Sequence, residues 1–149
     1  LHARKFGWNE DMLFKSQIPK IKIDSGYLAI PKLLNESKLA LHTYIGTGYL
    51  ETLTSNFPTI IFANLKECLV NSETKEYLKI LEKVNIFHDN YSSAAKFINN
   101  NWNNIDEWWN KEETQNARNI FCEKFAKLNK NKVKKIYRLI NDQKKLLIN

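Results

Sequence analysis

Glycine and proline are scarce in this sequence, which has four and three of them among 149 residues. So few chain-breaking residues exclude a collagen-like or low-complexity chain and leave little room for a flexible linker. Cysteine occurs twice, at Cys68 and Cys122, without the paired spacing of a zinc site, so we expect no metal and no disulfide framework. No apolar run reaches the roughly 18 residues that a membrane-spanning helix needs. These features favour a globular protein of a reducing compartment, and we expect it to be cytoplasmic.

Positive charge is concentrated at the C-terminal end. Of the net charge of +7, residues 129–149 contribute +6, from seven Lys or Arg and one Asp, which leaves +1 for residues 1–128. We therefore expect one domain over 1–128 and a basic C-terminal helix over 129–149. The cationic face of that helix suits an anionic membrane surface, which would hold the protein peripherally at the inner face of the membrane. Nothing beside it favours nucleic acid as a partner.

Short apolar segments that are typical of strands alternate with helical patterns up to about residue 98, and helical patterns alone follow. The expected strands are "KIKID" (20–24), "KLALHTY" (38–44, buried), "PTIIFA" (58–63) and "NIFHD" (85–89). The expected helices include 9–17, capped by Asn9, and 92–102, capped by its opening serines. This alternation predicts an α/β fold, a Rossmann-like parallel sheet flanked by helices, with an all-helical C-terminal extension. Ligands of such a sheet bind at the carboxyl ends of its strands.

Two of the four glycines flank Thr47 in "HTYIGTGYLETL" (42–53), between an expected strand and an expected helix. Glycine lets a ligand approach the backbone closely, and a helix start offers unpaired N–H groups. The pattern therefore predicts a phosphate site, with Glu51 one turn into the helix to accept hydrogen bonds from a ribose diol. The residues alone leave a second interpretation open, in which the glycines and Thr47 simply make a turn.

The stretch "HTYIGTGYLETLTSNFPTIIFAN" (42–64) resembles the donor half of GT-B-type glycosyltransferases. It is most similar to a transferase family found in bacterial surface-polysaccharide gene clusters. The resemblance is carried by Thr43–Tyr44, the glycine-containing loop, Tyr49–Leu50–Glu51 and "NFPTIIF" (56–62). With further stretches such as "FGWN" and "WWNKEETQNARNIFCEKFAK", it extends over roughly residues 6–128.

The resemblance implies that the chain is the donor-binding half of a GT-B fold, truncated at its N-terminus and inactive without an N-terminal acceptor domain. It implies a nucleotide-activated sugar as donor, a cell-surface polysaccharide as acceptor and no metal cofactor. The positions that match the family's donor site, or lie on its loops, are Thr43, Tyr44, Gly46, Thr47, Gly48, Glu51 and Asn64. Arg4, after a first expected strand, is a further candidate for neutralising phosphate charge.

Two other functions stay open at this point. A nucleotide-sugar epimerase can have the same architecture and the same kind of loop. A non-catalytic module could use the basic helix to bind a membrane or a partner. Outside the loop, we interpret His42 as a packed histidine, His88 as equally compatible with a structural and a site role, and Trp102, Trp108 and Trp109 as core or interdomain anchors.

Overall fold

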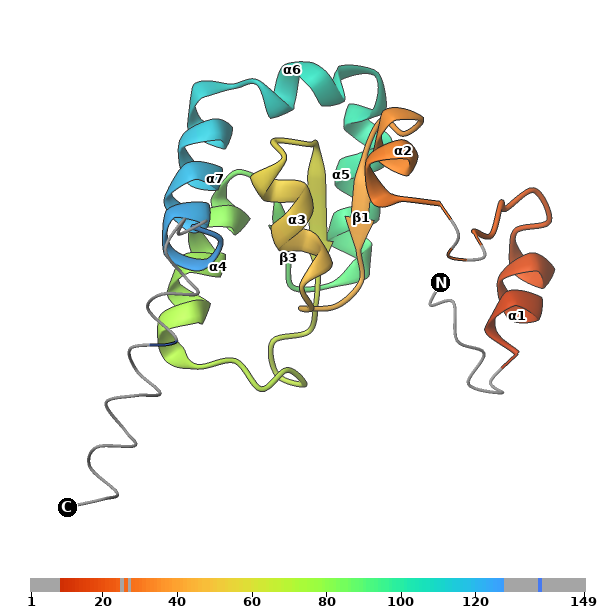
Figure 1. The fold of residues 1–149 in the computed structure, drawn as a ribbon, viewed down its shortest axis with the longest axis horizontal. Helices are drawn as coiled ribbons and strands as arrows, with labels where there is room; N and C mark the ends of the chain where they lie inside the picture. Colours follow the sequence, from red (N-terminus) through yellow and green to blue (C-terminus); the bar gives the residue numbers. More distant parts are fainter. Residues whose placement is uncertain (1–8, 25, 27, 128–136, 138–149) are drawn as a thin grey trace.

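The structure is a computed structural model that describes residues 9–24, 26, 28–127 and 137 (Figure 1). Arg4 and the expected basic helix over 129–149, apart from Tyr137, lie outside these residues. The helices are α1 (Glu10–Gln17), α2 (Ile30–Asn35), α3 (Gly48–Thr54), α4 (Ser72–Lys83), α5 (Tyr91–Asn101), α6 (Ile105–Trp109) and α7 (Glu112–Phe125). The strands are β1 (Ala40–His42), β2 (Thr59–Phe62) and β3 (Phe87–His88), and the 3-10 helix η1 (Trp102–Asn104) joins α5 to α6.

The three strands form one parallel sheet in the order β1-β2-β3. Ala40 pairs with Thr59 across the first ladder, and Ile61 pairs with Phe87 across the second. The central strand β2 is buried over its first three residues, as its run of β-branched side chains favours. The predicted fold class is confirmed, because helices flank this parallel sheet and helices alone follow its last strand among the described residues.

Helices cover both faces of the sheet (Figure 1). α3 packs against β1 and β2 in front of the sheet in this view, and α5 packs against β2 and β3 behind it. α7 packs against both α3 and α4, which ties the helical C-terminal part to the helices that connect the strands. α1 lies apart from the sheet.

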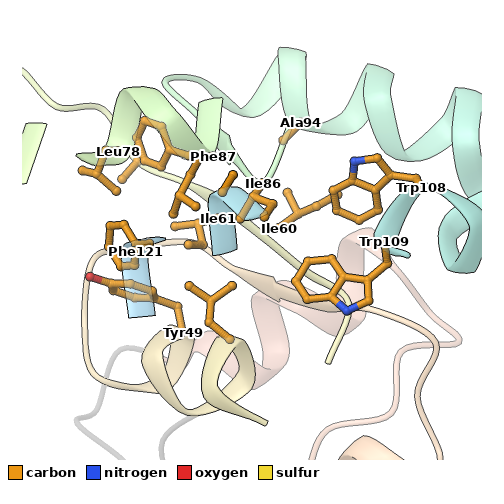
Figure 2. Close-up of a cluster of buried hydrophobic side chains, with 14 of the residues drawn as sticks. Tyr49, Ile60, Ile61, Leu78, Ile86, Phe87, Ala94, Trp108, Trp109 and Phe121 are labelled. Atoms are coloured by element: carbon orange, nitrogen blue, oxygen red, sulfur yellow. The ribbon is translucent and has the colours of Figure 1, made fainter. Parts of the chain in front are cut away.

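The core is centred on the side chains of β2 (Figure 2). Ile60 and Ile61 lie between Tyr49 and Phe121 on one side and the tryptophans of α6 on the other. The rings of Tyr49 and Phe121 are 6.1 Å apart between centroids, a separation at which aromatic pairs attract each other. Because Tyr49 belongs to α3, this packing fixes the helix that follows the glycine-containing loop.

Asparagine takes the place of glycine at the ends of two helices. Asn56 after α3 and Asn85 after α4 have positive φ angles of 53° and 61°. The backbone N–H of Phe57 donates to the Thr52 carbonyl at 3.0 Å, and that of Ile86 to the Leu81 carbonyl at 2.9 Å. These bonds define the Schellman motif, which requires a left-handed residue that glycine or asparagine supplies. The chain therefore turns sharply into β2 and β3 without using a glycine.

Two predicted strands differ from the structure. Residues 20–24 form no strand, although their alternating pattern predicts one. The alternation of apolar and polar residues shows only that a strand here would have one apolar face and one polar face. A strand also needs a neighbouring strand to pair with. Asp24 instead accepts a hydrogen bond from the Gly26 N–H in a tight turn. The predicted strand over 38–44 is shorter, and it is not buried, because β1 is an edge strand and Leu41 is 48 % exposed.

Two predicted helix caps are also wrong. Asn9 has a left-handed backbone conformation and its side chain makes no capping hydrogen bond to α1. At α5 the cap is Asn90, which accepts from the Ser93 N–H at 2.8 Å, and not one of the serines. The hydroxyl of Ser93 is used elsewhere, by His88.

Candidate functional site

The loop over residues 43–47 connects the carboxyl end of β1 to the start of α3, at the lower end of the sheet in Figure 1. The segment that follows β2 and the short turn that follows β3 leave the sheet at the same edge. The structure thus brings the predicted loop and Asn64 to the edge where parallel sheets bind their ligands.

The N–H groups of residues 43–48 have no hydrogen-bond acceptor in the part of the chain that the structure describes. Backbone bonding resumes only at Leu50 and Glu51, whose N–H groups both donate to the Thr47 carbonyl, Leu50 at 3.0 Å. Thr43, Tyr44 and Thr47 are exposed, so these amides are not enclosed by the core. Consecutive backbone N–H groups without partners are available to donate hydrogen bonds to a bound anion.

The two glycines of the loop, Gly46 and Gly48, matter because they have no β-carbon, and not because of an unusual backbone conformation. Neither Gly46 nor Gly48 has a positive φ angle. Among the described glycines, Gly26 has one. A β-carbon on Gly46 would collide with the ring of Tyr44, which lies directly against it. Gly46 therefore allows the close approach of an aromatic ring that is itself 68 % exposed to solvent.

Donors other than the amides are also present. Within the described chain, the hydroxyl groups of Thr43 and Thr47 have no hydrogen-bond partner. Thr47 occupies the position before α3 without capping it through its side chain. Because α3 has only seven residues, its dipole is short, so an anion bound here would depend chiefly on hydrogen bonds from the loop amides and hydroxyls.

Glu51 lies in the first turn of α3 and is exposed. It stands at the wall of a cavity of about 670 Å³ on the outer side of α3. The other lining residues come from α2, α3 and its following turn, and the end of α7: Ile30, Pro31, Leu34, Asn35, Leu50, Thr54, Ser55, Phe57, Phe125, Ala126 and Lys127. A carboxylate between an amide-rich loop and a largely apolar cavity is placed to accept hydrogen bonds from a ligand that reaches both.

His42, the last residue of β1, lies beneath the loop. Its Nε2 is 3.1 Å from the hydroxyl of Thr52, which is buried, and its ring packs edge-on against Tyr49. Burial lowers the pKa of His42 below its ordinary value, although the Glu51 carboxylate partly opposes this shift. The prediction of a packed histidine is confirmed, but sequence reasoning missed Thr52.

Asn64 lies at the predicted edge, directly beyond β2, with its side chain engaged in its own turn. Its Nδ2 donates to the Glu67 carboxylate at 2.7 Å, and its Oδ1 accepts from the Lys66 N–H at 3.1 Å. A ligand that used the Asn64 amide would have to compete with these two bonds. Arg4 lies outside the described residues.

His88 ends β3 at the same edge, but both of its ring nitrogens are occupied. Nδ1 is 2.8 Å from the Ser93 hydroxyl and Nε2 is 3.2 Å from the Asn85 carbonyl. Burial lowers the pKa of His88, with the Asn85 carbonyl and Asp89 opposing the shift. His88 is 3 % exposed, so it has a structural role.

The tryptophans divide into two groups. Trp108 and Trp109 are buried, as predicted, whereas Trp102 is 49 % exposed with the Lys38 ammonium above its ring. Among the described residues, no helix is long and apolar enough to cross a membrane. The same residues contain no group of three or more His, Cys, Asp or Glu side chains that is arranged to hold a metal ion.

The structure thus combines a parallel α/β sheet with a loop of unpartnered amides at the carboxyl edge of that sheet. Comparison with models of protein families shows to which family the chain belongs. The model of the LIC12162 family transferase matches residues 1–140, and the chain belongs to this family of transferases. No curated protein and no solved structure matches the chain.

Proposed function

We propose that this chain supplies the donor-binding part of a transferase that moves a sugar from a nucleotide-activated donor to a cell-surface polysaccharide. The observation that carries the proposal is the row of unpartnered N–H groups over residues 43–48 at the carboxyl edge of the sheet. Membership of a transferase family and the resemblance of residues 42–64 to GT-B donor domains support it.

The loop suits the chemistry of the leaving group. When a sugar leaves a nucleoside diphosphate, negative charge builds up on the diphosphate oxygens. Amide donors that are already aimed at this position need no reorganisation as the charge develops, so they stabilise the transition state more than the ground state. The free hydroxyls of Thr43 and Thr47 add two donors at the same place.

Glu51 gives the site its preference for a nucleotide over a bare phosphate. Its carboxylate accepts hydrogen bonds from the ribose diol while the diphosphate lies on the loop, one turn away. The sugar is then left at the open edge of the sheet, where we propose that an acceptor-binding domain faces it across a cleft, as in GT-B enzymes.

Calorimetric titration of the chain with CDP-, UDP-, GDP- and CMP-linked ligands tests the proposal. We expect one class of nucleoside diphosphate to bind with an affinity well above that of inorganic pyrophosphate. The matched variant is Glu51→Gln, which keeps the shape of the side chain and removes its charge. It should weaken nucleotide binding and leave pyrophosphate binding unchanged or stronger, because a nearby negative charge is gone.

Two results would contradict the proposal. One is the absence of heat and of any spectral change with every ligand of the panel. The other is nucleotide binding that Glu51→Gln leaves intact and that also persists when Thr43 and Thr47 are both replaced by valine, because the ligand would then lie elsewhere.

A further inference from the structure

The hydrogen bonds around His42 favour one tautomer of its imidazole ring. The Thr52 hydroxyl donates to the Tyr49 carbonyl at 3.1 Å, and that carbonyl can only accept. With that hydroxyl hydrogen in use, the Thr52 oxygen accepts from His42, whose Nε2 is 3.1 Å away, and this arrangement favours the tautomer with hydrogen on Nε2. In the neutral imidazole the other nitrogen, Nδ1, is left with a bare lone pair.

This bare nitrogen lies beside the loop. A β-carbon on Gly48 would be 3.6 Å from Nδ1 and 3.4 Å from Cε1 of His42, which is ordinary van der Waals contact. The absence of that carbon leaves Nδ1 uncovered at the residue where the loop enters α3. Within the described chain, Nδ1 has no hydrogen-bond partner.

We propose that His42 is a ligand-contacting residue of the loop and that its Nδ1 takes up one proton from solvent when a phosphate oxygen binds beside Gly48. Nδ1–H then donates to that oxygen, and Nε2–H keeps its bond to Thr52. The inference rests on the proposed function, because it needs a diphosphate on the loop, and it adds a coupling of anion binding to proton uptake.

The surroundings of His42 are compatible with both the neutral imidazole and the protonated imidazolium. Burial keeps the imidazole neutral in the free protein. Of the described charged groups, Glu51 on α3 acts on it and favours the protonated form, while Tyr49 on the same helix is held neutral because burial raises its pKa. The neighbouring strand presents Ile61 at the paired position. A bound phosphate adds negative charge near Nδ1 and so raises the affinity of His42 for a proton.

Calorimetry of the whole chain with inorganic pyrophosphate, in two buffers of different ionisation enthalpy near neutral pH, measures the proton uptake directly. Two variants remove the effect by different routes. His42→Gln removes the titrating group, and Gly48→Ala keeps His42 while its new methyl group covers Nδ1. For both we expect the uptake to disappear and the affinity to fall on the order of ten-fold, the size of one charge-assisted hydrogen bond. The difference from wild type cancels the titration of pyrophosphate itself.

Nitrogen NMR of the histidine side chains gives an independent readout. In the free protein the His42 signals should show hydrogen on Nε2 and none on Nδ1, and saturating pyrophosphate should protonate Nδ1. His88 is the internal control, because both of its nitrogens are occupied and its signals should not change.

The outcomes separate this inference from the proposed function. If pyrophosphate binds without proton uptake, or with uptake that both variants retain, the role of His42 is wrong and the donor loop stands. A free-protein tautomer with hydrogen on Nδ1 overturns the inference in the same way. If pyrophosphate does not bind at all, both proposals fall together.

Discussion

The indole Nε1 of Trp109 donates to both the backbone carbonyl and the side-chain oxygen of Asn56, each at 3.1 Å and 53 residues away along the chain. Trp108, its neighbour, donates in the same way to the Val84 carbonyl at 2.8 Å. Asn56 and Val84 belong to the turns that end α3 and α4 and lead into β2 and β3. α6 therefore holds the amino ends of two strands, at the sheet edge opposite the candidate site (Figure 1).

Replacing Trp109 by phenylalanine should lower the free energy of unfolding by about 1–3 kcal/mol, because the smaller ring leaves space in the core around the buried Trp109 and both hydrogen bonds to Asn56 are lost. Urea denaturation followed by circular dichroism measures this. Trp102→Phe is the matched control, since it makes the same chemical change at a half-exposed ring, and it should cost less than about 1 kcal/mol. Equal costs for the two variants would show that the bond to Asn56 does not secure the turn.

Asn85 is exposed and left-handed, so substitutions there report on the backbone alone. Asn85→Ala should destabilise the protein by about 1 kcal/mol, because a residue with a β-carbon resists this conformation. Asn85→Gly should be neutral or slightly stabilising, since glycine adopts it freely. Thermal unfolding of the pair measures the difference. A glycine variant as unstable as the alanine variant would mean that the Asn85 side chain, and not its backbone, is required.

The stability of the protein should fall as the pH is lowered from about 7.5 to about 5. Burial lowers the pKa of His88 in the folded chain, whereas the unfolded chain titrates near about 6.5, so the unfolded state binds the proton more readily. This contribution is complete above the unfolded pKa and is lost as the pH falls toward the folded one. Burial also lowers the pKa of His42, so His42 adds to the loss of stability at low pH.

Urea titrations at the two pH values measure this dependence. His88→Gln cannot titrate, so it should reduce the slope of stability against pH, whatever its effect on stability at pH 7.5. A wild-type protein that is more stable at the lower pH would contradict the assigned direction.

Gly46 and Tyr44 should show strong coupling in a double-mutant cycle. Gly46→Ala forces the Tyr44 ring away from the loop and should lower pyrophosphate affinity, while its cost in stability stays below about 1 kcal/mol because the exposed ring can move. In a Tyr44→Ala background the same change should have almost no effect. Additive losses of pyrophosphate affinity would mean that the two residues act independently. Glycine would then be required at position 46 for its backbone conformation and not for the packing of Tyr44.

Helices and strands could be predicted from the sequence where the pattern of residues within the element was itself sufficient. The apolar, β-branched run of β2 predicts a buried central strand, and the glycines before "YLETL" predict a strand-to-helix loop at the binding edge. The periodic apolar face of α4, with Leu78 and Leu81, predicts a packed helix, and both are buried.

The remaining features depend on partners that are distant in the sequence. Residues 20–24 have a strand pattern but no pairing strand, and β1 has pairing on one side only. The tight turns at Asn56 and Asn85 gave no distinct signal, because asparagine is frequent throughout this chain. The link between His42 and Thr52 spans ten residues and becomes visible only when α3 is packed on β1.

Titration of the ¹⁵N-labelled chain with pyrophosphate, followed through its backbone amide signals, tests the central claim most directly. We expect saturable shifts concentrated at residues 43–48, with smaller changes at Glu51 and none at the opposite edge near Asn56 and Asn85. Unchanged loop signals at saturating ligand, or shifts confined to the basic residues 129–149, would contradict it.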